Sequence, residues 1–464
     1  MSAAAGKSLV GPTGATSVTP VDELTARQFS LATPLTRQAL ERVQLQVLQA
    51  TIAGAVKHSP FYRTHLSSLT PATFTSLEDL QNLPLLDADQ VRAAGESLLC
   101  VSRSRVARVV TLQTSGSTGL PKRLAFSAAD LERTLAFFRH GMQVLVSSAD
   151  RVLVLLPWEL PDSVGDLLLR ALRRDGLYAI GHWPPYPFRA AAELLRRDRI
   201  TCAVGLPQHL LALATVAGPT RLRSVLLCSD YAAPSVRRRI ELLAGCATFL
   251  HYGTTESGLG GGVECYCHDG CHLREADLLV EIIDPDNGRP VADGHYGEIV
   301  LTTLGRQAMP LIRYRTGDGA RLSRETCRCG GVTARLYDIS GRLGGVTLAD
   351  GTALSSCELD DLLFDIPDLL DYRITLEAAS RDRLRLDYLA HGPAAGIEKR
   401  IVACLQAIPA IQRSCDAGSL SLGPIQRVPE MTAHHTVKRT ILDLRPSGDS
   451  HALTAVQNRT ELEI

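Results

Sequence analysis

The hydrophobic pattern of the chain changes character twice along its length. Apolar positions recur every three or four residues from Pro34 to Leu66, a spacing that predicts helix. Beyond Val106, short apolar runs such as RVVTLQT, RVLVLLP, CAVGLP and SVLLCSD alternate with helical stretches such as DLERTLAFFRHGMQVL and PSVRRRIELLA. Strands that alternate with helices predict crossover units around a largely parallel sheet.

The second change begins near Leu278. The text LLVEIIDPDNGRPVADGHYGEIVLTTL predicts a strand, an Asp-Asn-Gly turn and a further strand. After Gly341 the chain mixes strands (DYRITLEA, RLRLDYLA) with helices (CELDDLLFDI, IEKRIVACLQAI). We therefore predict an α/β fold class, in which a large N-terminal domain of crossover β/α units precedes a small C-terminal α+β domain.

These patterns divide the chain into four parts. Residues 1–25 are small, polar and punctuated by Gly and Pro, so we expect a disordered leader there. The large domain is predicted to span residues 26–340 and the small domain residues 341–446. Residues 447–464 resemble the leader and are expected to form a flexible tail.

Composition narrows the range of partners. Lys plus Arg and Asp plus Glu both number 49, so no net charge attracts nucleic acid or an anionic membrane. We find neither the apolar core of a signal peptide nor an apolar run of about 18 residues. We expect a cytoplasmic protein that acts on small molecules. Its 12 cysteines should then be thiols or metal ligands rather than disulfides.

A glycine-rich loop follows the apolar run that begins the large domain's alternating pattern. Residues 111–122 are TLQTSGSTGLPK. Glycines let the backbone approach an anion closely, and hydroxyls and N–H groups donate hydrogen bonds to phosphate oxygens. The spacing differs from that of P-loop NTPases. Taken alone, the segment has a Ser/Gly-rich surface turn as its alternative explanation.

Two further motifs follow in order, HYGTTE at residues 251–256 and YRTGD at residues 314–318. Together the three motifs resemble those of the adenylate-forming superfamily of acyl-CoA synthetases, peptide-synthetase adenylation domains and luciferases. The text between His58 and Arg445, above all EIIDPDNGRPVADGHYGEIVLTTLGRQAMPLIRYRTGD, is most similar to the phenylacetate-CoA ligase branch. The resemblance implies ATP-dependent activation of a carboxylic acid, aryl or short acyl, as its acyl-AMP, followed by transfer to CoA.

The resemblance also implies roles for the residues of the first two motifs. The loop should hold the β- and γ-phosphates of ATP through Thr114, Ser115, Gly116, Ser117, Thr118, Gly119 and Lys122. For Lys122 the alternative is a solvated surface lysine. The second motif should supply Tyr252 against the adenine, Gly253 and Thr254 in the same nucleotide-binding turn, Thr255 at the α-phosphate and Glu256 at Mg²⁺.

The third motif and its surroundings complete the implied nucleotide site. Asp318 should accept hydrogen bonds from the ribose hydroxyls, because an ionised carboxylate is an acceptor-only group. Arg342 matches an arginine that also reaches the ribose. The segment CSDYAAP takes the place of the adenine-binding turn of the family, which makes Asp230 and Tyr231 candidates there.

Cysteine and histidine crowd into one stretch of the large domain. CYCHDGCH starts at Cys265, and CRC follows much later at Cys327. Zinc in closed structural sites takes four sulfur or nitrogen ligands. We favour Cys265, Cys327 and Cys329 as ligands, with the fourth from Cys271, His268 or His272. The ligase branch carries a similar pattern, which supports a structural zinc; free buried thiols are the alternative.

The small domain departs from the family pattern at two places. The acidic hinge of relatives is replaced by Leu343, Gly344 and Gly345. The family lysine that acts in adenylation aligns with Thr436, and the nearest cation is Lys438.

The second departure leaves three interpretations open. The chain is a ligase in which Lys438 or another group substitutes for that lysine, an enzyme that passes the acyl-adenylate to an amine or a carrier protein, or a nucleotide- or acyl-binding protein without turnover. The intact loop, Glu256 and Asp318 favour turnover. The expected ligands are ATP or AMP, Mg²⁺, CoA, a carboxylic acid and a structural Zn²⁺, and the expected assembly is a homodimer.

Overall fold

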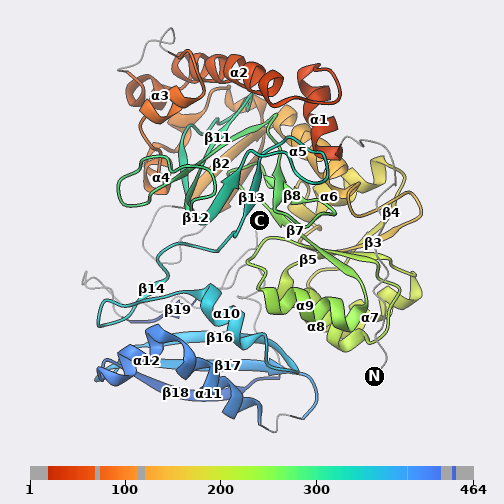
Figure 1. The fold of residues 1–464 in the computed structure, drawn as a ribbon, viewed down its shortest axis with the longest axis vertical. Helices are drawn as coiled ribbons and strands as arrows, with labels where there is room; N and C mark the ends of the chain where they lie inside the picture. Colours follow the sequence, from red (N-terminus) through yellow and green to blue (C-terminus); the bar gives the residue numbers. More distant parts are fainter. Residues whose placement is uncertain (1–18, 68–73, 113–120, 394–395, 430–440, 446–464) are drawn as a thin grey trace. The chain divides into compact units, whose positions relative to one another are not determined.

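A computed structural model of the protein describes residues 19–67, 74–112, 121–393, 396–429 and 441–445 (Figure 1). The chain forms two compact units. Unit 1 comprises residues 1–146, 249–316 and 320–338, and unit 2 comprises residues 147–248, 317–319 and 339–464. Because unit 2 combines segments from both sides of Gly341, the domain boundary predicted there stays a prediction.

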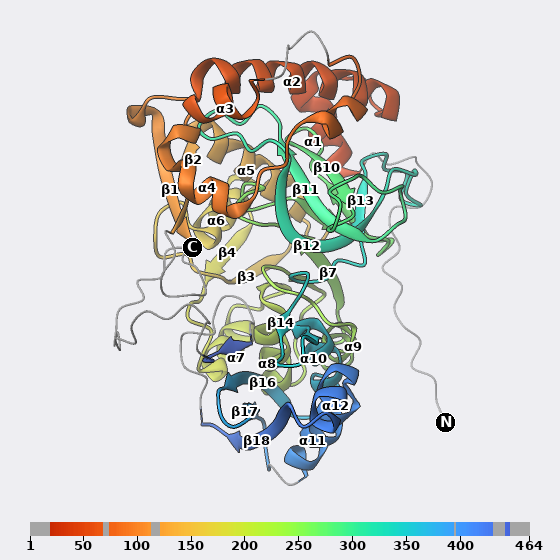
Figure 2. The same cartoon turned by 90° about the vertical axis from the view of Figure 1, so that its left-hand side faces the viewer.

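Unit 1 begins with helices that cover strands from later in the chain (Figure 2). Its helices are α1 (Pro20–Phe29), α2 (Arg37–His58), α3 (Pro60–His65), α4 (Ala88–Ala94) and α5 (Ala128–Met142), with short 3₁₀ segments at Glu78–Asn82, Gly95–Leu98 and Arg103–Arg105. Helix α1 begins inside the predicted leader of residues 1–25, so that boundary is too late for the helix. The Thr19 side chain accepts a hydrogen bond from the Asp22 amide, and Pro20 stands at the first helical position. Both are helix-start signals.

The strands of unit 1 form a sheet and a separate hairpin. The sheet runs in the order β10 (Leu278–Ile283), β11 (Gly297–Thr303), β12 (Tyr314–Ser323), β13 (Arg335–Tyr337), β9 (Cys271–Leu273), β8 (Gly262–Glu264) and β7 (Ala247–Tyr252). Strands β10 and β11 pair antiparallel, which confirms the predicted strand, turn and strand. The hairpin joins β1 (Val106–Leu112) to β2 (Lys122–Ser127), also antiparallel. Residues 108–112 of the apolar run RVVTLQT therefore belong to this hairpin and not to a parallel sheet.

Unit 2 contains the predicted crossover units. Its strands β6 (Ser224–Leu227), β5 (Cys202–Gly205), β3 (Arg151–Leu155) and β4 (Tyr178–Gly181) lie side by side and are all parallel. The connections carry helices α6 (Val164–Arg174), α7 (Phe188–Arg197), α8 (Pro207–Ala217) and α9 (Pro234–Ala244). Every residue of β5 and β6 is buried, as expected for a parallel sheet with helices on its faces. The α/β fold class is confirmed.

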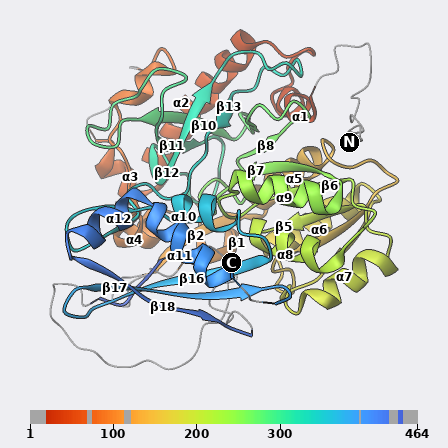
Figure 3. The ribbon, with the colours of Figure 1, turned by 60° about the horizontal axis from the view of Figure 1, so that its bottom comes forward.

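The C-terminal part of unit 2 has its own small sheet. Strands β18 (Leu420–Arg427), β17 (Asp382–Ala390), β16 (Leu369–Glu377) and β19 (Leu442–Asp443) are neighbours in that order, and β14 (Val346–Thr347) pairs with β15 (Ala353–Leu354). Helices α10 (Ser356–Leu363), α11 (Ile397–Ala407) and α12 (Pro409–Asp416) accompany these strands (Figure 3). Within the described part of the chain, no helix combines the length and apolar character needed to cross a membrane.

Candidate active site

A buried lysine at the start of β2 marks the first part of the site. Side chains alternate along a strand, so Lys122, Leu124 and Phe126 share one face, and all three are buried. The Lys122 ammonium forms an ion pair with the Glu256 carboxylate and donates to the Tyr314 hydroxyl at 2.9 Å. Lys122 is therefore not a solvated surface lysine, and the structure brings it together with Glu256 within unit 1.

Tyr314 completes this cluster from the first residue of β12. Its side chain is 1% exposed, and its hydroxyl donates to Oε1 of Glu256 at 3.2 Å. The lysine ammonium and the phenol thus hold the same carboxylate oxygen. Sequence reasoning missed Tyr314, although it opens the YRTGD motif, because only the aspartate of that motif was given a role.

A tight turn after β7 positions Glu256. Thr254 and Ser257 exchange two hydrogen bonds, in which the Thr254 amide donates to the Ser257 hydroxyl at 3.0 Å and the Ser257 amide donates to Oγ1 of Thr254 at 3.2 Å. The Gly258 amide closes the turn on the carbonyl of Thr255 at 3.0 Å. A Cβ atom at Gly253 would lie 2.8 Å from the carbonyl oxygen of Leu259, so a side chain does not fit there.

Tyr252 precedes this turn and is buried. The residues assigned to the nucleotide are therefore consecutive in a segment, Tyr252 to Glu256, whose turn is fixed by these hydrogen bonds. That compactness suits a site in which neighbouring residues must contact different parts of one ligand.

Arg306 approaches the same cluster from the segment between β11 and β12. Its Nη1 donates to the carbonyl oxygen of Glu256 at 2.8 Å, and its guanidinium carbon lies 4.3 Å from the centre of the Phe126 ring. Burial lowers the pKa of Arg306 to about 10, which leaves the side chain charged at neutral pH. No motif pointed to this arginine.

The residues assigned to the ribose lie together in unit 2. Asp318 and Arg342 form an isolated antiparallel bridge, and Nε of Arg342 lies 3.6 Å from Oδ1 of Asp318. Asp318 is buried. Gly317 has φ +74°, and a Cβ atom there would lie 2.7 Å from the Arg342 guanidinium. The backbone therefore needs glycine beside this pair.

Asp230 and Tyr231 follow β6 in unit 2. The Tyr231 amide donates to Oδ1 of Asp230 at 2.9 Å, and its hydroxyl donates to Oδ1 of Asp361 at 3.0 Å. Burial and the Asp361 carboxylate raise the pKa of Tyr231. The loop residues 114–119, as well as Thr436 and Lys438, lie outside the described residues.

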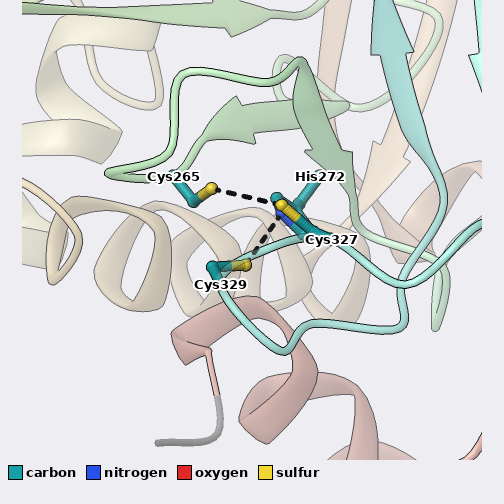
Figure 4. Close-up of side chains that lie close together, drawn as sticks. All are labelled: Cys265, His272, Cys327 and Cys329. Carbon is teal, nitrogen blue, oxygen red and sulfur yellow. Dashed lines mark hydrogen bonds between the residues drawn. The ribbon is translucent and has the colours of Figure 1, made fainter.

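Four of the crowded cysteine and histidine side chains converge in unit 1 (Figure 4). One ligand atom from each of Cys265, His272, Cys327 and Cys329 lies within 4.8 Å of all the others, and all four residues are buried. The Sγ atoms of Cys265 and Cys327 are 3.8 Å apart, and Sγ of Cys329 is 3.4 Å from Nε2 of His272. Three thiols and one imidazole are a donor set that fits structural zinc.

His268 and Cys271, the other candidates for the fourth ligand, do not join this group. Nδ1 of His268 lies 3.2 Å from Oε2 of Glu264, and the Cys271 thiol donates to the carbonyl of Leu250 at 3.6 Å. Cys271 and His272 are consecutive in β9, so their side chains point to opposite faces of the sheet. Only His272 can face the two cysteines of the later segment.

A chain of hydrogen bonds orients His272. The Thr333 hydroxyl donates its hydrogen to Oδ1 of the buried Asp22 at 2.7 Å, and Nδ1 of His272 lies 3.0 Å from the same hydroxyl oxygen. Because the hydroxyl hydrogen is already committed, His272 Nδ1 must donate. In the neutral imidazole Nε2 then carries the lone pair and faces the thiols, the tautomer that a metal ligand requires.

Comparison with known proteins shows which family this chain resembles. The family described as AMP-binding enzyme matches residues 80–310. The phenylacetate-coenzyme A ligase of Thermus thermophilus is 27% identical over 370 residues, which are 73% of this chain and 78% of that protein. The ligase of the same name from Escherichia coli K12 is 26% identical over 337 residues, 69% of this chain and 75% of that protein.

A solved structure supports the fold. The structure of 2-hydroxyisobutyryl-CoA ligase in the postadenylation state superposes with a TM-score of 0.73 at 20% identity and covers 94% of each chain. At 20% identity this structural likeness supports the fold alone. The sequence relatives and the three ordered motifs support the phenylacetate-CoA ligase branch. The chain therefore belongs to the adenylate-forming superfamily, in the branch of the phenylacetate-CoA ligases.

Proposed function

We propose that the protein joins a carboxylic acid to ATP, forming an acyl-AMP and releasing pyrophosphate, and then transfers the acyl group to the CoA thiol and releases AMP. The similarity to phenylacetate-CoA ligases over about 70% of the chain carries this proposal. The acid is expected to be aryl or short acyl.

The first step brings two anions together, so the site must neutralise charge at the phosphates. Lys122 supplies a positive charge at the end of the glycine-rich loop, whose residues Thr114 to Gly119 we assign to the same phosphates. Glu256 is the hard carboxylate that would hold Mg²⁺, which would withdraw charge from the phosphate oxygens. These two residues form an ion pair, so the lysine and the carboxylate assigned to Mg²⁺ lie in direct contact.

The remaining roles follow from the motifs. Asp318 and Arg342 are assigned to the ribose, Tyr252 to the adenine and Thr255 to the α-phosphate. Lys438 is proposed to supply the cation for adenylation in place of the family lysine. A cytoplasmic location and a homodimer stay predictions.

We also propose that Cys265, His272, Cys327 and Cys329 hold one structural Zn²⁺. The carrying observation is the convergence of four buried ligand atoms, one of them in a tautomer set by Thr333. The site lies on different strands and loops from Lys122 and Glu256, so its role is to join segments of unit 1 rather than to take part in the reaction.

Acid-dependent exchange of labelled pyrophosphate into ATP, measured over a panel of aryl and short-chain acids, tests the first step. One acid class should support exchange, and thioester should form when CoA is added. An absence of exchange with all acids, combined with an absence of thioester from supplied acyl-AMP, would contradict the function. If exchange occurs without transfer to CoA, and an amide forms from an added amine, then the acyl acceptor is an amine rather than CoA.

A further inference from the structure

Arg306 is a partly buried cation in the active-site cluster of unit 1. Its Nη1 donates to the Glu256 carbonyl, its guanidinium lies over the Phe126 ring, and its Nη2 is inaccessible to solvent and has no hydrogen-bond partner in the structure. Among the described residues, it forms no ion pair with a carboxylate. Shielding a charged group from water is costly unless the group is paired, so an anionic ligand at Nη2 would stabilise this guanidinium.

The two nearest carboxylates are engaged elsewhere. The Asp130 carboxylate accepts hydrogen bonds from the amides of Ser127 at 2.8 Å, Gln307 at 2.8 Å and Ala308 at 3.0 Å. The Glu256 carboxylate is held by Lys122 and Tyr314. Neither is therefore the anion that Arg306 requires.

The backbone around Arg306 is fixed. The two hydrogen bonds to Asp130 hold Gln307 and Ala308 against the start of α5, and the Gly305 amide donates to Oγ1 of Thr51 at 3.2 Å. The guanidinium is thus held in place before any ligand arrives, which lowers the cost of binding one.

We propose that Arg306 binds the β- and γ-phosphate oxygens of ATP, and those of pyrophosphate, beside Lys122. This inference rests on the proposed function. Lys122 is already ion-paired with Glu256, so Arg306 is the cation of this cluster that has no ion pair among the described residues. Lys122 holds the carboxylate of Glu256 and Arg306 holds its carbonyl, so both cations adjoin the residue assigned to Mg²⁺. A planar guanidinium also matches the oxygens of a phosphate group.

Binding constants for ATP, pyrophosphate and AMP, measured by titration calorimetry with Mg²⁺ present, test the role. Arg306→Gln should weaken ATP and pyrophosphate binding by about 10- to 100-fold, the range expected for hydrogen bonds to a charged group, and should leave AMP binding unchanged. Arg306→Lys should retain part of the affinity because it keeps the charge. Arg105→Gln is the matched control, since this exposed arginine contacts the neighbouring Gln307 at 3.1 Å.

Three results would overturn the role. Equal losses for ATP and AMP would indicate a structural residue, unchanged ATP affinity would exclude phosphate contact, and a higher KM for the acid alone would assign Arg306 to the substrate carboxylate. If Arg306→Gln does not fold, Arg306→Lys decides by the same comparison of ATP with AMP. Wild-type protein that shows neither acid-dependent exchange nor thioester formation from supplied acyl-AMP would instead contradict the proposed function itself.

Discussion

Removing the Asp22 carboxylate should weaken zinc binding, although Asp22 is not itself a proposed ligand and acts through Thr333 and His272. Asp22 accepts hydrogen bonds from the Val332 amide at 2.8 Å, the Thr333 amide at 3.3 Å and the Thr333 hydroxyl at 2.7 Å. In Asp22→Ala the Thr333 hydroxyl loses its acceptor and can donate to Nδ1 of His272 instead. That arrangement favours the tautomer with hydrogen on Nε2, where the metal must bind.

The magnitude follows from comparable sites. Loss of a residue that orients a metal ligand costs about 10- to 100-fold in metal affinity, which corresponds to about 1.4 to 2.8 kcal/mol. The buried donors left without a partner should add a loss of about 1 to 3 kcal/mol in folding stability. Asp22→Asn should show a smaller effect because it keeps Oδ1, the acceptor of the Thr333 hydroxyl.

Competition with a chromogenic chelator measures the zinc affinity, and thermal unfolding with and without added zinc measures the stability. Glu23→Ala is the control, because it removes the adjacent carboxylate of α1, whose partner is Arg27 on the helix surface. Thr333→Val should reproduce the loss of zinc affinity. An equal zinc affinity for Asp22→Ala and wild type would refute the orientation argument, and zinc-free native protein would refute the site.

Three further predictions concern the nucleotide, the pH and the missing lysine. Asp318→Ala should weaken ATP and AMP binding by about 1.5 to 3 kcal/mol, since the ribose hydroxyls lose a charged acceptor, and unchanged affinity in a folded variant would remove Asp318 from the site. Burial and the charge of Arg274 lower the pKa of His251 from 6.5 to about 4, so stability present above pH 6.5 should fall, by up to about 3 kcal/mol, as the pH drops through that window. His251→Phe should flatten this part of the stability profile, and equal slopes would contradict the assignment. Thr436→Lys should speed adenylate formation but not thioester formation from supplied acyl-AMP, and Lys438→Ala should slow adenylation; if neither changes the rate, the cation comes from another residue.

The α/β fold class could be predicted from the sequence because its buried parallel strands consist of short runs of apolar residues. The β3, β5 and β6 runs each met the pattern of a strand between helices. RVVTLQT met it equally well, yet its residues 108–112 belong to β1 of an antiparallel hairpin. Periodicity reports burial and local conformation, whereas the partner of a strand depends on contacts distant in sequence.

The site shows the same division between local and distant information. Motifs identified Lys122 and Glu256, but their ion pair joins residues 134 apart in sequence. The alternation of side chains along β9 would have favoured His272 over Cys271 as the fourth zinc ligand, but only if the position of β9 beside Cys327 and Cys329 had been known. No local signal links Asp22 to Thr333 or marks Arg306, because each depends on which segments meet in three dimensions.

The contact between Asp22 and Thr333 also sets an order of events during synthesis. The two residues are 311 positions apart. At a usual rate of about 5 to 20 residues per second, the ribosome makes Thr333 roughly 15 to 60 s after Asp22. Helix α1 can pack against α5 and against Leu35 and Leu40 well before that, because these residues are made earlier. Its Asp22 carboxylate, in contrast, gains its partners Val332 and Thr333 only after His272 has been made, so the histidine is oriented late in synthesis.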